Sequence, residues 1–302
     1  MKTEKRYQFR ERLVLSNKPF EYKLREKNNN EISFLDGVDF FGDDSVVICH
    51  AKEDFNEYLK VCFGVTEKSC KAIKITVEIT DIGLEDVRSY KGRVVEISDG
   101  CIYIRAYDER GAAQAIYDLE DAMSLKKQPY VDMGITKNKP IFSPRMVHSA
   151  YGMDVYPEGY LQILAKEGID AIMLTLVGVN ESADGPRDVN SIIDLAAEYG
   201  IDVYAYWHKN IFYSPEAEDA EDVYGAAYGE LFKVHSKLKG IIFVGEIIQF
   251  PSKDKNSTGR QYWNFLNEDN FPDPKPGVSH WPCEDYITWL DIAKKGNKAR
   301  KA

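Results

Sequence analysis

The order of hydrophobic and polar residues along the chain becomes regular only after about residue 45, and the first 40 residues show no clear period. Residues 46–48, Val-Val-Ile, predict a short buried strand, and Phe55, Leu59 and Phe63 then recur at helical spacing. Between residues 73 and 79, apolar residues alternate with polar or small ones, which predicts a half-buried strand.

A hairpin and a second helix are predicted next. Residues 94–97 and 102–105 are strand-like and flank Asp99-Gly100, a dipeptide that favours a tight turn. Asp108 can then cap a helix. That helix carries one apolar stripe, made of Ala112, Ala115, Ile116, Leu119 and Met123. A strand, a helix, three strands and a helix together predict a compact α+β module.

The pattern changes at the prolines between residues 137 and 144, so we expect a domain boundary there, with domains at 1–138 and 139–302. Beyond it, apolar strands alternate with amphipathic helices, which predicts a parallel sheet with both faces covered. The expected strands are 146–151, 171–177, 201–207 and 240–245, and the expected helices are 157–166, 189–199, 218–235 and 284–295. Gly168 and Gly200 end two of these helices, where a left-handed residue is common.

Composition and charge disfavour several classes of function. The formal net charge of −10 disfavours nucleic-acid binding, because phosphates repel an acidic surface. No stretch approaches the roughly 20 apolar residues of a membrane span, and the polar N-terminus does not resemble a secretory signal. Five cysteines without a C-x-x-C pair favour reduced thiols in the cytoplasm. The histidines lack metal-ligand spacing, so neither a metal nor another cofactor is expected.

Two segments resemble parts of known glycoside hydrolases. Residues 107–119, Tyr-Asp-Glu-Arg-Gly-Ala-Ala-Gln-Ala-Ile-Tyr-Asp-Leu, resemble the helix of the small domain that precedes the barrel in family 20 hexosaminidases and in α-glucuronidases. Residues 139–145, Lys-Pro-Ile-Phe-Ser-Pro-Arg, resemble the entry to the first barrel strand of those enzymes. The resemblance implies an α/β fold in which a small α+β domain precedes a TIM (β/α)₈ barrel. It also implies hydrolysis of O-glycosyl bonds in a carbohydrate substrate.

The length of the second domain implies that this barrel is partial. A complete (β/α)₈ barrel takes about 250 residues, whereas residues 140–302 number 163. The pattern holds about four βα units, so we expect the N-terminal half of a barrel. Such a chain would be a truncated gene product or a fragment of a longer protein. The sequence carries no signal for an oligomeric state.

Glu246 is the best candidate for a catalytic residue. It ends Ile-Ile-Phe-Val-Gly-Glu, where apolar residues and a glycine bring a carboxylate to the carboxyl end of a predicted strand. The neutral form of such a half-desolvated acid is favoured, which suits donation of a proton to a glycosidic oxygen. The resemblance also implies a general acid Glu after the fourth barrel strand. Alternatively, Glu246 forms a salt bridge with a lysine or arginine of the barrel.

Further candidates would shape a sugar pocket beside this acid. Arg145, at the start of the first barrel strand, can bind sugar hydroxyls or a carboxylate through paired N–H donors, or it can be structural. His148 can bind sugar or be a core histidine. Trp207 and His208 end the third strand, where aromatic faces stack on sugar rings or simply pack. Asp254 is the nearest second carboxylate, although a loop aspartate is more often solvated.

Three interpretations of function follow, and the leading one is a glycosidase with Glu246 as general acid. Family 20 enzymes have an Asp directly before this Glu, whereas Gly245 stands here, which argues against their substrate-assisted mechanism. The second is a non-catalytic carbohydrate-binding protein, or a fragment of a larger glycosidase, which the lack of a paired carboxylate favours. A metal-dependent barrel hydrolase is weaker, because ligand spacing is missing.

Overall fold

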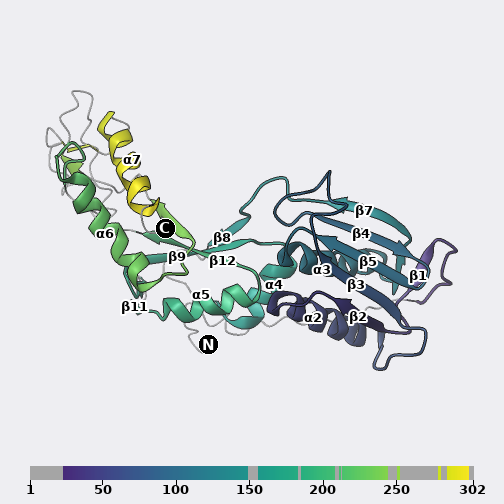
Figure 1. Cartoon of the computed structure of the whole chain (residues 1–302). Coiled ribbons are helices and arrows are strands. Elements are labelled where there is room, and N and C mark those ends of the chain that lie inside the picture. The colour runs from purple at the N-terminus through teal and green to yellow at the C-terminus, as the bar shows by residue number, and fades with distance from the viewer. Residues whose placement is uncertain are drawn as a thin grey trace, which may run out of the picture. The chain divides into compact units, whose positions relative to one another are not determined.

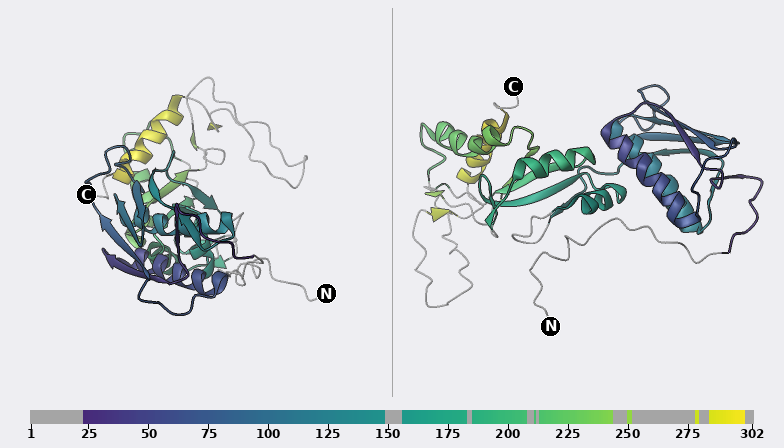
Figure 2. Two further views of the ribbon diagram at one scale, coloured as in Figure 1. Left: turned by 90° about the vertical axis from the view of Figure 1, so that its right-hand side faces the viewer. Right: turned by 90° about the horizontal axis from the view of Figure 1, so that it is seen from below.

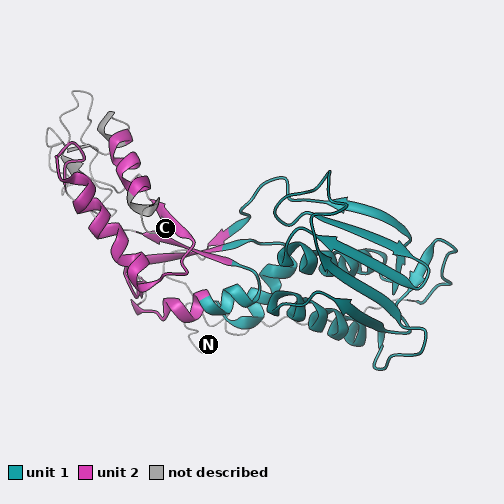
Figure 3. Ribbon diagram, viewed as in Figure 1, with its two compact units in different colours: residues 1–146, 156–171, 194–201 teal, residues 147–155, 172–193, 202–302 magenta. Residues whose placement is uncertain are grey.

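The computed structural model describes residues 23–148, 156–182, 185–207, 211, 213–243, 250–251, 278–279 and 284–298. The fold is mixed α/β, and the chain divides into two compact units (Figure 3). Unit 1 comprises Met1–Met146, Tyr156–Ala171 and Asp194–Ile201, and unit 2 comprises Val147–Val155, Ile172–Ile193 and Asp202–Ala302. Each unit is thus discontinuous in sequence. Whether residues 1–138 and 139–302 fold as separate domains stays a prediction.

The centre of unit 1 is a five-stranded sheet (Figure 1). Its strands are β2 (Val38–Gly42), β3 (Ile73–Ile79), β4 (Arg93–Ser98), β5 (Cys101–Ala106) and β7 (Gly134–Asn138). They are ordered β2-β3-β5-β4-β7, with β3 parallel to β2 and β5, and β4 antiparallel to β5 and β7. The predicted strand at 73–79 and the predicted hairpin are therefore confirmed.

Two long helices, α2 (Val46–Phe63) and α3 (Glu109–Lys126), lie side by side across one face of this sheet (Figure 2). Each begins at a side-chain cap. Ser45 Oγ accepts a hydrogen bond from the Ile48 N–H at 3.3 Å, and Asp108 Oδ1 accepts one from the Gly111 N–H at 2.7 Å. The helix predicted after Asp108 is confirmed, and its apolar stripe is buried.

The strand predicted at residues 46–48 is wrong, because these residues form the first turn of α2. Val47, Ala51 and Phe55 lie four residues apart and are all buried, so the apolar run belongs to one face of a helix. A short apolar run fits either a strand or a helix. The cap at Ser45 favours the helix, because its hydroxyl satisfies an N–H group of the first turn.

The hydrophobic pattern of the sequence does not predict a small sheet in unit 1, because one strand of this sheet contains a buried charged residue. Strands β1 (Glu31–Ser33) and β6 (Tyr130–Asp132) pair antiparallel. The Glu31 side chain is 1% exposed, and its carboxylate lies 2.6 Å from the Arg25 guanidinium and 2.8 Å from Lys126 Nζ. Hydrogen bonds from Arg25 and Lys126 lower the pKa of Glu31, although burial opposes them. Paired in this way, a glutamate takes a core position.

The second sheet lies largely in unit 2 and follows the predicted alternation of strands and helices. Its main strands are β8 (Met146–His148), β9 (Ala171–Gly178), β12 (Asp202–Trp207) and β13 (Gly240–Phe243). The helices between them are α4 (Glu158–Lys166), α5 (Val189–Glu198) and α6 (Ala220–Val234). Neighbouring strands pair in the order β8-β9-β12-β13, and β12 is parallel to β13. The predicted elements are thus confirmed within the described residues.

Shorter elements complete the two units. The hairpin of β10 (Glu181–Ser182) and β11 (Gly185–Pro186) extends the second sheet beside β9, and β14 (Phe250–Pro251) pairs with β15 (Val278–Ser279). Helix α7 (Glu284–Lys298) packs on α6 and β13. Its Trp289 is fully buried, donates a hydrogen bond to the Tyr228 hydroxyl at 3.2 Å and packs edge-on against the Phe243 ring. This aromatic cluster is the core beneath α6 and α7.

Gly168 and Gly200 have left-handed backbones, with φ of +74° and +68°, as their positions after α4 and α5 predict. Gly168 also allows a close approach of side chains. A β-carbon at this position would lie 2.8 Å from Nη1 of Arg145 and 3.0 Å from Oε1 of Gln114. The glycine therefore leaves room for two polar side chains that line a cleft in unit 1.

Candidate functional site

Two of the sequence-based candidates for a sugar site, Trp207 and His148, lie at the carboxyl ends of strands in the second sheet. Trp207 is the last residue of β12, is 4% exposed, and pairs in register with Phe243 at the end of β13. His148 is the last residue of β8 and is exposed. Three further candidates lie outside the described residues: Glu246, His208 and Asp254. Their roles, and those of Trp207 and His148, stay predictions.

Arg145 lies directly before β8, where its backbone is fixed to the start of β9. Its N–H donates to Asp170 Oδ2 at 2.7 Å, and its carbonyl accepts hydrogen bonds from the N–H groups of Asp170 at 2.8 Å and Ala171 at 3.2 Å. The Arg145 guanidinium lies 3.5 Å from the Gly168 carbonyl oxygen. Arg145 thus precedes β8, whereas Trp207 ends β12, so the two candidates come from opposite ends of their strands.

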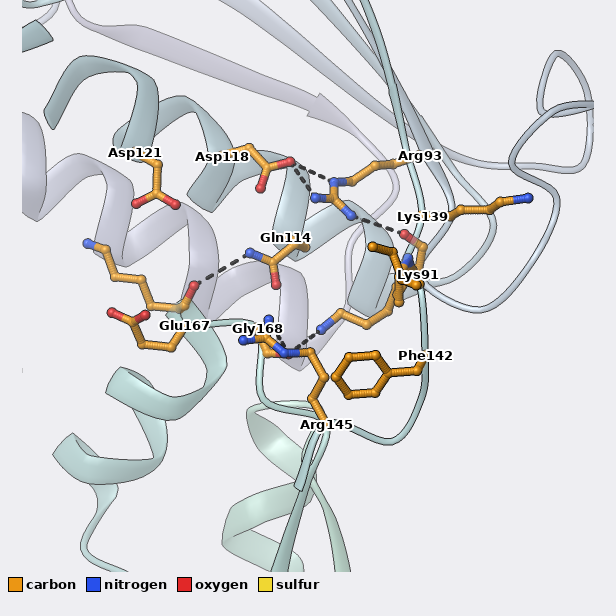
Figure 4. A pocket seen from close by; sticks show the side chains of 13 residues that line it. Lys91, Arg93, Gln114, Asp118, Asp121, Lys139, Phe142, Arg145, Glu167 and Gly168 are labelled. Carbon is orange, nitrogen blue, oxygen red and sulfur yellow. Dashed lines mark hydrogen bonds and ion pairs between the residues drawn. The ribbon is translucent and has the colours of Figure 1, made fainter. Parts of the chain in front are cut away.

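The Arg145 side chain contributes to a cleft of about 540 Å³ in unit 1 (Figure 4). The cleft is bordered by the start of β4, one face of α3, residues 139–145 and the end of α4. Its size falls within the usual range for sites that bind small molecules. Most of its lining is polar or charged, with Phe142 as the aromatic exception.

Lys91 and Asp170 form a buried ion pair at one edge of the cleft. Lys91 Nζ lies 2.9 Å from Asp170 Oδ1, and the two side chains are 7% and 2% exposed. Burial lowers the pKa of Lys91, and the hydrogen bond with Asp170 opposes this effect. Lys91 also has a left-handed backbone with φ of 56°, which costs a residue other than glycine about 1–2 kcal/mol. The ion pair and its hydrogen bonds hold the lysine in this conformation.

Arg93 and Asp118 form a second ion pair across the cleft. Arg93 Nε and Nη2 donate to Asp118 Oδ2 at 2.7 and 2.6 Å, and the arginine side chain is 11% exposed. The pair joins β4 to α3 and neutralises both charges. Arg93 therefore shapes the wall of the cleft without presenting an unpaired cation to it.

Lys166, at the end of α4, enters a buried cluster that carries more negative than positive charge. Its Nζ forms an ion pair with Glu120 of α3 and lies 3.6 Å from Asp54 of α2. The carboxylate side chains are 0% and 1% exposed. Burial raises the pKa of Glu120 to about 8, and the charge of Asp54 adds to this effect, although Lys166 opposes it. Burial lowers the pKa of Lys166, but the charges of Glu120 and Asp54 outweigh it, so this pKa is raised.

Sequence reasoning identified Arg145 by its residue type but missed its partners. Lys91 and Glu120 lie in segments whose local pattern predicts only a turn and a helix. One sequence signal does point to Asp170: Gly-Ile-Asp occurs twice, at residues 168–170 and 200–202, each time at the start of a predicted strand. In the second copy of the repeat, Asp202 pairs with Lys239 at 3.0 Å. Both repeats therefore place an aspartate in an ion pair at the amino end of a strand.

Other kinds of site are limited to what the described residues hold. No group of three or more His, Cys, Asp or Glu among them is placed to bind a metal ion. None of their helices combines the length and hydrophobicity needed to cross a lipid bilayer. Four cysteines in this part of the chain are free thiols: Cys49, Cys62, Cys70 and Cys101.

The sequence matches no protein-family model and no curated protein. Solved structures of similar fold include a β-N-acetylhexosaminidase of family GH20 from Streptomyces coelicolor A3(2), with a TM-score of 0.56 and 11% identity over 91% of this chain and 63% of that one. They also include the chitobiase FjGH20 of Flavobacterium johnsoniae, with a TM-score of 0.50 and 15% identity over 72% of this chain and 42% of that one. The structure of CpGH84B has a TM-score of 0.50 and 14% identity over 76% of this chain and 43% of that one.

The described architecture is thus a glycosidase-like α/β fold. At these identities the likeness concerns the fold alone. The chain spans less than two thirds of the length of each of these three proteins.

Proposed function

We propose that the chain is a glycoside hydrolase-like enzyme that cleaves O-glycosyl bonds of a carbohydrate, with Glu246 as general acid. The observation that carries the proposal is the strand order β8-β9-β12-β13, with one helix between each consecutive pair. This is the order of the first four strands of a TIM barrel, so we propose a partial barrel. In such barrels the reacting groups follow the carboxyl ends of the strands, and Glu246 follows β13 by three residues.

The proposed chemistry is transfer of a proton from Glu246 to the leaving glycosidic oxygen. Trp207 at the end of β12 would stack on a sugar ring, and His208, His148 and Asp254 would bind hydroxyls. The buried position of Trp207 beside Phe243 supports an apolar floor at this end of the sheet. The free thiols of the described residues support a reducing, cytoplasmic location.

A non-catalytic carbohydrate-binding protein, or a fragment of a larger glycosidase, is the second candidate. The observation that favours it is Gly245, which stands where the family 20 pattern has the Asp of its carboxylate pair. A glycosidase normally uses two carboxyl groups on opposite sides of the scissile bond. With one carboxylate alone, a site of this kind would bind sugar without turnover.

Hydrolysis of a panel of nitrophenyl glycosides by the whole chain tests the proposal. The panel includes N-acetylhexosaminides, because two of the similar structures are a chitobiase and a β-N-acetylhexosaminidase, together with glucosides and glucuronides. We expect Glu246→Gln to lower kcat by about 10²- to 10⁴-fold, the usual contribution of a general acid. Glu57→Gln, at an exposed position on α2, is the matched control and should leave the rate unchanged.

Turnover that survives Glu246→Gln would contradict the catalytic role of Glu246. Absence of turnover on every substrate, with retained binding of a sugar by the folded chain, would favour the non-catalytic candidate instead. Circular dichroism of each variant shows whether a lost rate reflects chemistry or misfolding.

A further inference from the structure

The cationic side chains that line the cleft of unit 1 differ in how they are neutralised. Lys91, Arg93 and Lys166 each face a carboxylate at short range. Lys139 and Arg145 do not. Lys139 Nζ donates to the Asp86 carbonyl oxygen at 3.2 Å, and within the described part of the chain the Arg145 guanidinium contacts only the Gly168 carbonyl, at 3.5 Å. That single long contact leaves most of its five N–H donors available. The Arg145 guanidinium is therefore available to bind an anionic group of a ligand.

The base of the Arg145 side chain is held by the scaffold. Its N–H and carbonyl both bond to Asp170, which is itself anchored by Lys91. Gly168 leaves space for the guanidinium, because a β-carbon there would approach Nη1 to 2.8 Å. Fixing the backbone in this way limits the positions that the guanidinium can take, which reduces the conformational entropy lost when a ligand binds.

The surroundings of Arg145 supply the other contacts that a sugar requires. Figure 4 shows the Phe142 ring beside Arg145 and the Gln114 amide on the opposite side. Phe142 is 66% exposed, so its ring face can stack on the apolar face of a pyranose. Gln114 offers both a donor and an acceptor for hydroxyl groups. The cleft therefore combines an anion receptor, an aromatic surface and an amide.

The charge of the cleft selects the kind of anion. Asp121 and Glu167 also line it and offset the charges of Lys139 and Arg145, so the cleft offers no excess of positive charge to a doubly charged group. A carboxylate carries one negative charge, and its two oxygens match the fork of a guanidinium. A phosphate carries nearly two charges at neutral pH and is less well tolerated here.

We propose that the cleft of unit 1 binds an acidic sugar, with the sugar carboxylate paired to the guanidinium of Arg145 and the ring stacked on Phe142. This makes unit 1 a carbohydrate-binding unit, a role that does not rest on hydrolysis by the strand-end residues.

Titration of the whole chain with D-glucuronate, followed by isothermal calorimetry or protein-observed NMR, tests the proposal. Glucose and glucose 6-phosphate are the neutral and the doubly charged probes. We expect glucuronate to bind at least 10-fold more tightly than either. Arg145→Gln should weaken glucuronate binding at least 10-fold, whereas Arg145→Lys, which keeps the charge without the fork, should give an intermediate loss.

Arg88→Gln is the matched control, because Arg88 is an exposed arginine whose charge is already paired with Asp81 at 2.6 Å. It should bind glucuronate as the parent chain does. The proposal is overturned if the parent chain does not bind glucuronate, if glucose or glucose 6-phosphate binds equally well, or if Arg145→Gln binds as tightly as Arg88→Gln. Thermal unfolding of each variant confirms that the fold is retained.

Failure of this proposal is distinguishable from failure of the proposed enzymatic function. Glu246→Gln should retain glucuronate binding in the cleft even where it abolishes hydrolysis. Conversely, a chain that hydrolyses glycosides but shows no Arg145-dependent binding would refute the cleft proposal alone.

Discussion

Two buried ion clusters attach α4 and the residues after it to the rest of unit 1, and they differ in charge balance. Asp170 accepts hydrogen bonds on both carboxylate oxygens, from Lys91 Nζ and from the Arg145 N–H, so one anion meets one cation. Lys166 faces two carboxylates, those of Glu120 and Asp54. Glu120 Oε1 is buried without a hydrogen-bond donor among the described residues.

The difference shows that burial alone does not decide how an ionisable group behaves. In the balanced pair, hydrogen bonds satisfy the carboxylate and compensate for its lost hydration. In the unbalanced cluster the two carboxylates carry one more charge than Lys166 neutralises. Protonation of Glu120 removes this excess at the lowest cost in free energy. The Lys91–Asp170 pair therefore acts as a constant structural link, whereas the stability of the Lys166 cluster depends on pH.

The largest expected effect comes from Lys166→Met, which removes the only cation of the unbalanced cluster described above. The charge of Asp54 would then remain buried without a counter-charge, beside a Glu120 that is largely protonated at pH 7, so we expect a loss of about 3–5 kcal/mol in the free energy of unfolding. Urea unfolding at pH 7 measures it. Lys60→Met, which breaks an exposed pair with Glu57, should cost no more than about 1 kcal/mol. Equal losses in the two variants would show that the buried cluster contributes nothing special.

The balanced pair should respond less strongly to Asp170→Asn. Asparagine keeps the size of the side chain and one oxygen acceptor but loses the charge that faces Lys91, so we expect a loss of about 1.5–3 kcal/mol. The same urea experiment compares it with Asp81→Asn, which alters the exposed pair with Arg88. A loss larger than that of Lys166→Met would reverse the ranking of the two clusters.

The smallest effect, and the most specific, is the pH dependence of Glu120→Gln. The folded-state pKa of Glu120, about 8, lies above its ordinary value of 4.5. Its contribution to stability is therefore full below about pH 4.5 and is lost as the pH rises through 8. Glutamine mimics the protonated form, so Glu120→Gln should lie within about 1 kcal/mol of the parent chain at pH 5 and exceed its stability by at least about 1.4 kcal/mol more at pH 8.

Unfolding midpoints at pH 5 and pH 8 for the parent chain, Glu120→Gln and the exposed control Glu57→Gln measure this gap. A gap that stays constant between the two pH values would mean that Glu120 does not titrate in this range.

Local signals were enough to predict most of the fold. The cap at Asp108, the turn at Asp99-Gly100 and the alternation at 73–79 each depend on neighbours in sequence, and all three are confirmed. Strand β1 pairs with β6 about 100 residues away and contains the buried Glu31, so no local pattern could reveal it. The strand predicted at 46–48 is wrong because three apolar residues are too few to fix a period.

The candidate site was less predictable, because ion pairs and clefts join segments that are distant in sequence. Arg145 was identified by its chemistry, but the sequence could not show that Asp170 anchors its backbone or that Phe142 lies beside its guanidinium. The catalytic role of Glu246 stays a prediction, which rests on the strand before it rather than on its neighbours in space.

The discontinuity of unit 1 has a consequence for the order of events during synthesis. Lys166 follows Glu120 by 46 residues, so at about 5–20 residues per second the ribosome takes roughly 2–9 s to add the lysine after the glutamate. During that interval α2 and α3 can emerge, but their buried carboxylates have no partner from α4. Unit 1 therefore reaches its final stability only after translation has passed residue 201, and a pause before that point would prolong a state with exposed interaction surfaces.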